Sequence, residues 1–227
     1  FVGAARDKGY DVLVMDGQLD THFIGWFENK NQGTRFVRVD ADVVDKLIEK
    51  ENNLKMALSS AQQDLLRPVF EAQLPAEDKI RYTVSFEPMA ENQMPVMITQ
   101  NEFMRRMKDM AAMGGSGMQF YGQLPDNFNV VINGNHPLVA EILGEVEASY
   151  GDKLKTTNKK LDAAIAEQRS FEELVKDKKA EDFSQEEKDK QQEVDKKVED
   201  LHRQRTERLT EIGRENKLVK QVVDLAL

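Results

Sequence analysis

Hydrophobic and polar positions in residues 1–40 predict two strands with a helix between them. Residues 1–8 are amphipathic, which is typical of the end of a helix. The mostly apolar run YDVLVM at 10–15 predicts a buried parallel strand, and the alternating sequence TRFVRVD at 34–40 predicts a second strand. Between them, THFIGWFENK at 21–30 has the spacing of a short amphipathic helix. This order is typical of the end of a βαβ-type layer, which is too small to bury a core alone.

Residues 59–150 predict a small mixed sheet with packed helices. The strand-like segments are KIRYTVSFE, MPVMITQ and FNVVING, at 79–87, 94–100 and 128–134. The helical segments are SSAQQDLLRPVFEAQL, EFMRRMKDMAAM and NHPLVAEILGEVEASY, at 59–74, 102–113 and 135–150. Pro68 can kink the first of these helices, and Pro137 suits the first turn of the last. The acidic segment 41–58 is compatible with either a linker or a helix.

The character of the chain changes over 151–213, where charged residues dominate and apolar residues recur sparsely at helical spacing. Ser184 and Glu187 form a capping-box pattern, which indicates that a second helix begins there. We therefore expect two long helices that turn near 181–184 and fold back as an antiparallel hairpin. A solvated charged spacer is the simplest role for it. A partner-binding coiled coil is the alternative, although the apolar spacing is irregular. The fold class is α+β, with this charged helical hairpin inserted near the C-terminus.

Composition limits the partners that the chain can have. The net charge is −9 and the sequence pI is near 5.0, which disfavours nucleic acid and anionic membrane surfaces. The chain has no cysteine, which excludes disulfides and thiolate sites and suits a reducing cytoplasm. No apolar run is long enough to span a membrane. Both ends read as interrupted elements, so we expect a fragment of a longer protein.

No motif in the sequence predicts an active site. Asp16 follows a strand-like run, as the phosphorylated aspartate of a response-regulator receiver does, but no acidic pair precedes it and no strand-end lysine follows. His22, His136 and His202 lack metal-binding spacing, and GGSG at 114–117 lacks the GK[ST] of a phosphate loop. We therefore predict no catalytic residue, metal site or cofactor site.

Methionine is concentrated in one segment, with eight of the ten methionines between Met89 and Met118. On a helix, Phe103, Met107 and Met110 share one face, and Met104 and Met113 lie beside it. An ordinary core face is the usual explanation. However, methionine specifies a core poorly and suits surfaces that accept many apolar partners. The neighbouring arginines and lysine can cover such a face or meet acidic groups of a partner.

Three segments carry a resemblance to a known family. FVGAARDKGYDVLVMDGQLDTHFIGWF is similar to a stretch of the heat-shock protein 90 chaperones that reads approximately FLERLKEKGYEVLYMVEPIDEY. FMRRMK resembles the family's MERIMK, and FNVVINGNHPLV resembles its LEINPDHSII junction, with Asn133 and His136 on the family's Asn and His. The segments follow the family's order and spacing over residues 1–143.

The resemblance implies a division of the chain. Residues 1–50 are expected to be the end of the middle domain and 51–150 the sheet and amphipathic helix of the C-terminal dimerisation domain. Residues 151–213 are expected to be an inserted hairpin and 214–227 the first of two dimerisation helices. The matching dimer positions are Leu218, Val222, Val223 and Leu225. The second helix is expected beyond Leu227, so a chain that ended there would form a weakened homodimer.

The resemblance also implies a function. The family's ATP and magnesium site lies in domains that this segment does not match, so the whole protein is expected to be an ATP-driven cytoplasmic chaperone and this part no enzyme. Phe103 and Met107 match the family's client-binding helix, and helical spacing adds Met104, Met110 and Met113. Trp26 and Phe27 are a second candidate client contact. A structural or adaptor protein, whose charged hairpin binds a fixed partner, is the alternative.

Overall fold

The computed structural model describes residues 1–17, 19–41, 54–100, 102–112, 124–149, 151–176, 178 and 183–227. Within these residues the fold is α+β, with helices and one three-stranded sheet, as the sequence predicts. The chain divides into two compact units. Unit 1 contains residues 1–59, 74–140 and 221–227, and unit 2 contains residues 60–73 and 141–220. The predicted domain boundaries at 50, 150 and 213 stay a prediction.

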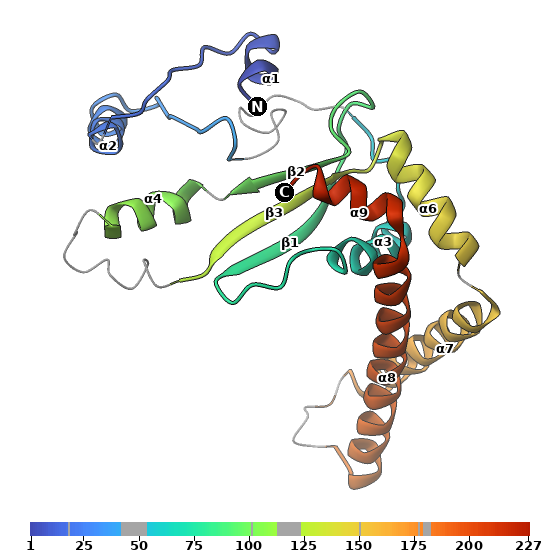
Figure 1. Cartoon of the computed structure of the whole chain (residues 1–227). Helices are drawn as coiled ribbons and strands as arrows, with labels where there is room; N and C mark the ends of the chain where they lie inside the picture. The colour runs from blue at the N-terminus through green and yellow to red at the C-terminus, as the bar shows by residue number, and fades with distance from the viewer. Residues whose placement is uncertain are drawn as a thin grey trace. The chain divides into compact units, whose positions relative to one another are not determined.

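The sheet of unit 1 has the strand order β1-β3-β2, with β3 at the centre (Figure 1). Its strands are β1 (Ile80–Glu87), β2 (Val96–Gln100) and β3 (Asp126–Asn133). β3 runs parallel to β1 and antiparallel to β2. Strand alternation places Val84 opposite Val130 and Val96 opposite Ile132 on one face, and all four side chains are buried. The predicted mixed sheet is therefore confirmed, in the three predicted segments.

The loop before helix α3 (Ser60–Glu71) is hydrogen-bonded to the turn after β3. The side chain of Asn135 accepts a hydrogen bond from the backbone N–H of Ala57 at 2.8 Å and donates one to the carbonyl of Lys55 at 3.1 Å. The buried side chain of Asn133 donates to the carbonyl of Ala90 at 2.8 Å. These side-chain bonds satisfy backbone groups that no sheet or helix reaches. Met56 packs so closely on Gly134 that a Cβ there would lie 2.3 Å from its sulfur.

Residues 1–41 contain helices α1 (Val2–Asp7) and α2 (Asp20–Lys30), as predicted, but neither predicted strand. Residues 10–15 pair with no strand among the described residues, and Val14 is 82% exposed. An apolar run becomes a strand only when a neighbouring strand pairs with its backbone. Residues 34–38 have no regular secondary structure and residues 39–40 lie in a turn, and side chains bond to both backbone polar groups of Phe36. The two strand predictions are therefore wrong.

Helix α4 (Glu102–Ala112) follows β2, as predicted. Helix α6 (Pro137–Ser149) follows β3 and begins with Pro137 as its first residue, where the missing N–H costs nothing. The side chain of His136 accepts a hydrogen bond from the backbone N–H of Leu138 at 3.1 Å. This histidine is part of the turn before α6.

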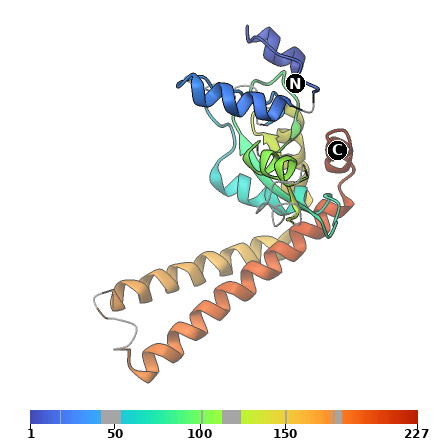
Figure 2. The same ribbon diagram turned by 90° about the vertical axis from the view of Figure 1, so that its left-hand side faces the viewer.

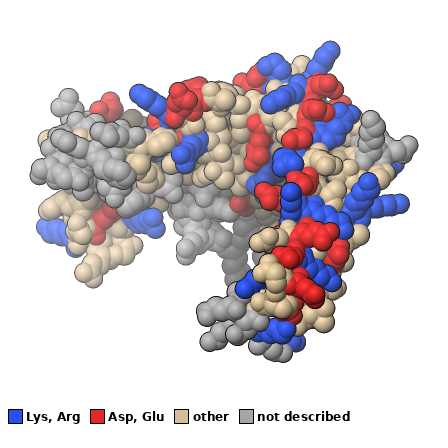
Figure 3. All heavy atoms as spheres, turned by 90° about the horizontal axis from the view of Figure 1, so that it is seen from below, with Lys and Arg blue, Asp and Glu red and all other residues tan. Residues whose placement is uncertain are grey.

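Unit 2 contains the predicted charged hairpin, formed by α7 (Gly151–Val175) and α8 (Gln185–Glu215) lying side by side (Figure 2). A small apolar cluster joins the two helices and consists of Leu161, Ala164, Ile165, Val198 and Leu201. Polar bonds add to it, such as Lys197 to Glu167 at 2.9 Å and Gln168 to Asp195 at 2.7 Å. The predicted capping box is present, with Ser184 and Glu187 each accepting a backbone N–H of the other. On the face drawn in Figure 3, acidic and basic side chains lie interspersed.

Helix α3 (Ser60–Glu71) contains Pro68 and packs on α8 within unit 2. Its predicted apolar face is buried and consists of Leu65, Leu66, Val69 and Phe70. The amide of Gln73 donates to the carbonyl of Gly213 in α8 at 2.7 Å. Helix α9 (Lys217–Asp224) follows α8 after Asn216, whose side chain accepts the N–H of Val219 at 2.8 Å.

Candidate functional site

Four aromatic side chains of unit 1 form an aromatic cluster, which consists of Phe23, Trp26, Phe27 and Phe36. The first three lie on α2, where residues three or four apart are neighbours. The ring centroids of Phe23 and Trp26 are 6.0 Å apart, and those of Phe27 and Phe36 are 5.7 Å apart. Trp26 is 55% exposed and Phe23 is 45% exposed. The cluster therefore exposes the apolar rings of Phe23 and Trp26 to solvent, while Phe27 and Phe36 are half-buried.

A cation lies over the exposed indole of this cluster. The ammonium of Lys30 is 5.0 Å from the centroid of the Trp26 ring. Lys30 is one turn after Trp26 on the same helix, so the contact follows from helical spacing. A cation over an exposed aromatic face contributes about 0.5–1 kcal/mol. The lysine stem therefore covers part of the indole without burying it.

Helix α4 carries the predicted methionine face, and we call it the methionine helix. Met104 and Met107 are half-buried. Phe103 and Met110 belong to the same helix, and Met113 lies outside the described residues. Sequence spacing therefore predicts the helix correctly, while the prediction that these residues bind clients stays a prediction.

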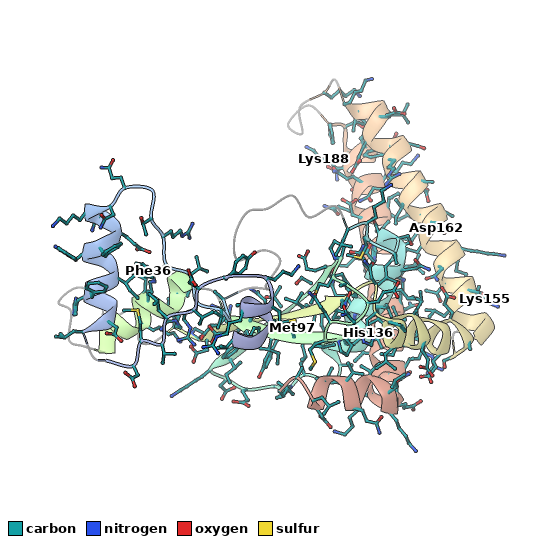
Figure 4. The ribbon with its side chains drawn as sticks, turned by 90° about the horizontal axis from the view of Figure 1, so that it is seen from above. Phe36, Met97, His136, Lys155, Asp162 and Lys188 are labelled. Atoms are coloured by element: carbon teal, nitrogen blue, oxygen red, sulfur yellow. The ribbon has the colours of Figure 1, made fainter. Side chains whose placement is uncertain are left out.

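The methionine helix is joined to the aromatic cluster by a closed set of polar contacts, which we call the Arg106 clasp. Arg106 Nη1 is 3.2 Å from Glu28 Oε2, and Arg106 Nη2 donates to the carbonyl oxygen of Phe36 at 2.9 Å. The backbone N–H of Phe36 donates to Glu28 Oε1 at 2.7 Å. Figure 4 shows Phe36 between the ribbons of α2 and α4. The clasp thus joins α2, which carries Trp26 and Phe27, to a helix that lies far along the chain.

Sequence reasoning missed Glu28, Phe36 and Arg106. The chain has 41 acidic and 32 basic residues, and residue spacing gives no signal for which of them pair across 78 positions. The helices that carry Glu28 and Arg106 are predicted, and so is the polar character of both positions. Their contact is a property of tertiary structure alone.

Two further charged contacts involve the methionine helix or the segment beside it. Lys108 Nζ is 2.6 Å from Asp126 Oδ1, which anchors the methionine helix to the start of β3. Arg38 donates from Nε to Asp40 Oδ1 at 2.6 Å. The hydrogen bonds from Arg38 lower the pKa of the Asp40 carboxyl, and the charge of Arg105 on the methionine helix acts in the same direction. The cations of this helix therefore act on acidic groups of the protein itself.

The four predicted dimer positions lie on or just after α9. Val222 and Val223 are buried within the chain, and Leu218 is half-buried. Leu225 is 81% exposed. That these four positions form a homodimer interface stays a prediction.

The described residues offer little other chemistry. Among them, no group of three or more acidic or histidine side chains is arranged to hold a metal ion. None of the described helices is long and apolar enough to cross a membrane. His22 and His202 are exposed.

Comparison with known proteins gives the family. HtpG chaperone proteins of Bacteroides thetaiotaomicron and Bacteroides fragilis are 39% and 40% identical over 227 residues, which is 100% of this chain and 33% of each relative. The HtpG chaperone protein of Porphyromonas gingivalis is 37% identical over 226 residues, again across 100% of this chain and 33% of the relative. No family model and no solved structure matches the chain. The chain thus spans about a third of the length of these relatives, and along its whole length it belongs to the family of the HtpG chaperones.

Proposed function

We propose that this chain is the C-terminal part of an ATP-driven chaperone, and that it binds unfolded or partly folded client proteins. The client surface consists of the aromatic cluster and the methionine helix. The observation that carries the proposal is the exposure of Phe23 and Trp26 on a cluster that the Arg106 clasp joins to the methionine helix. The family supports the same conclusion, because its relatives are named chaperones.

The side-chain chemistry suits clients of varied sequence. Exposed aromatic rings offer apolar area with few rotatable bonds, and methionine offers apolar area that adapts its shape. An unfolded chain presents apolar segments that a folded protein buries, so an adaptable apolar surface selects unfolded proteins over folded ones. Each buried apolar side chain of a client gains about 1.5–3 kcal/mol. A few such contacts give micromolar binding, which suits a chaperone that must also release its client.

The rest of the proposal concerns the whole protein. ATP and magnesium are proposed to bind in a part that this chain does not contain, and the energy of their turnover reaches the client surface by a shift between two conformations. A homodimer is proposed to form through α9 and the residue just after it. Leu225 is the exposed member of the predicted set, so it is the first contact that we propose for that interface. The proposed compartment is the cytoplasm.

A client-holding assay tests the proposal. Aggregation of a heat-unfolded protein is followed by light scattering with the wild-type chain, Trp26→Ala and Met107→Ser. Both variants should suppress aggregation several-fold less well than the wild type. Trp26 is exposed, so its variant should keep the fold, and circular dichroism checks both variants.

The matched control is Leu174→Ser, which removes an exposed apolar side chain from α7 in the charged hairpin. This control should hold clients as well as the wild type does. Equal loss in all three variants would show that exposed apolar area in general, rather than this surface, binds the client. Unchanged holding in folded Trp26→Ala and Met107→Ser would refute the proposal.

A further inference from the structure

We propose that Arg106 is a positioning residue that makes the aromatic cluster and the methionine helix act as one client surface. The inference rests on the proposed function and adds a positioning contact within that surface. Arg106 is assigned no direct contact with the client. It acts through Glu28 and through the backbone of Phe36, which connect the two halves of the surface.

The clasp is a closed ring of three partners. Each partner bonds to the other two, so both oxygens of Glu28, two nitrogens of Arg106 and both backbone polar atoms of Phe36 are used. The Phe36 ring packs edge-on against Phe27 at 5.7 Å between centroids. Moving the guanidinium therefore shifts the backbone that carries one aromatic ring of the cluster. The geometry links the position of the methionine helix to the arrangement of the rings.

The burial of the charges makes the clasp more persistent than a surface ion pair. The side chains of Arg106 and Glu28 are each 22% exposed. Exposed ion pairs are screened by salt and contribute little, whereas a partly buried pair with added hydrogen bonds is screened less and loses more when one partner is removed. The planar fork of arginine is also required, because its two nitrogens reach different acceptors at once. Lysine carries one point charge and cannot reproduce this geometry.

The same helix offers a matched control. Lys108 makes a similar ion pair, at 2.6 Å, but with Asp126 at the start of β3 instead of with α2. Its side chain is 20% exposed, close to that of Arg106. Neutralising Lys108 therefore removes a comparable charge and an anchor of the methionine helix. It leaves the link to the aromatic cluster intact.

A surface whose two halves are held together binds a client segment differently from two independent halves. Once one half binds, the second is presented at a high effective concentration. When the clasp is lost, each half keeps its own apolar residues but the two bind separately. The expected effect is weaker binding of long apolar segments with no change in the residues that contact them.

Hydrogen exchange with mass spectrometry, on the 227-residue chain, tests the inference in two ways. Without client, Arg106→Gln should raise exchange in the peptides of both α2 and α4, whereas Lys108→Gln should raise it in α4 alone. A reduced and alkylated, permanently unfolded protein is then titrated in as the client. As client is added, the protection of α2 and α4 from hydrogen exchange should rise with one common midpoint concentration of client in the wild type. In Arg106→Gln the two midpoints should separate by about fivefold, the order of a coupling between contacting residues.

Conservative variants show whether the role is positioning. Arg106→Lys should behave like Arg106→Gln, because the charge alone does not restore the fork. Glu28→Gln keeps an acceptor for the Phe36 N–H but loses the charge that binds Arg106. The double variant Glu28→Gln with Arg106→Gln should raise exchange in α2 and separate the two midpoints no more than Arg106→Gln does. Both substitutions remove the same contact, so their effects should not add.

Three results would overturn the inference. Unchanged exchange in α2 for Arg106→Gln would show that the clasp does not hold the two helices together. A common midpoint in that variant would show that the halves act as one surface without it. If no client protects either helix in the wild type, the proposed function fails and the client role of Arg106 fails with it, while the exchange of α2 without client still decides whether the clasp exists.

Discussion

Gly213 lies where α8 packs on α3, and replacing it with alanine should destabilise the protein even though alanine favours a helix. A Cβ at this position would lie 2.4 Å from the carbonyl oxygen of Val69 and 2.8 Å from its Cα. It would also lie 3.0 Å from the Cβ of Ala72. The first two of these atoms are backbone, so no side-chain rotation relieves the contact. The helices must separate, which strains the 2.7 Å bond from the amide of Gln73 to the Gly213 carbonyl.

The magnitudes decide the sign of the effect. Alanine in place of glycine in a helix interior gains about 1 kcal/mol of stability. Overpacking at a close contact costs about 1–3 kcal/mol, and this site is at the upper end because backbone meets backbone. Weakening the hydrogen bonds of Gln73 adds about 1 kcal/mol. We therefore expect Gly213→Ala to lower the free energy of unfolding by about 2–3 kcal/mol.

Urea unfolding followed by far-ultraviolet circular dichroism measures this change, with Gly144→Ala as the control. Gly144 lies on α6, is exposed, and has no atom within 4 Å of a Cβ built on it. The same substitution there should raise the free energy of unfolding by about 0.5–1 kcal/mol. Opposite signs at the two glycines would support the reasoning. If Gly213→Ala stabilised the protein as much as Gly144→Ala does, the close packing of α3 on α8 would be refuted.

Three further predictions concern the charged hairpin and its ends, and urea unfolding measures each. Ser184→Ala should cost about 1 kcal/mol, because it removes the acceptor at the start of α8. Bonds from Lys178 and from the Ser184 backbone lower the pKa of Glu187 below its ordinary value of 4.5, so its stabilisation is present above that pH and lost as pH falls through the lowered pKa. The stability difference between the wild type and Glu187→Gln should therefore shrink below pH 4.5, and a constant difference would contradict this assignment. Asn216→Ala should cost about 1 kcal/mol by leaving the N–H of Val219 without its cap.

Helices in this chain were predictable because their signals are local. The apolar spacing of α3 and the capping box of Ser184 and Glu187 depend on residues within one or two turns of each other. The three strands of the sheet were also predicted, since each is a short run rich in strand-forming residues, and in the structure each pairs with a neighbouring strand. The strands expected at 10–15 and 34–40 were wrong because strand formation depends on a partner. A strand-like sequence without a neighbouring strand forms no strand.

The candidate site was predictable only in part, for a related reason. The methionine helix and the aromatic residues Trp26 and Phe27 follow from residue type and helical spacing. The Arg106 clasp joins residues 70 and 78 positions apart through two side chains and one backbone unit. Glu28 and Arg106 bond to backbone atoms of Phe36, which almost every residue type has. The identity of Phe36 therefore gives no signal for these contacts. Only the folded structure identifies the contact.

Two of the charges beside the methionines have partners within the protein that the sequence did not indicate. Arginine and lysine on an apolar helix are expected to shield it from water or to meet acidic groups of a partner. In the structure, Arg106 bonds to Glu28 and Lys108 bonds to Asp126, so both cations are already used by the protein. Breaking a partly buried ion pair leaves the remaining charge without its partner, which costs free energy. A client carboxylate therefore competes poorly for these cations. Under the proposed function, we therefore expect the apolar side chains to contact the client and the charges to fix where those side chains lie.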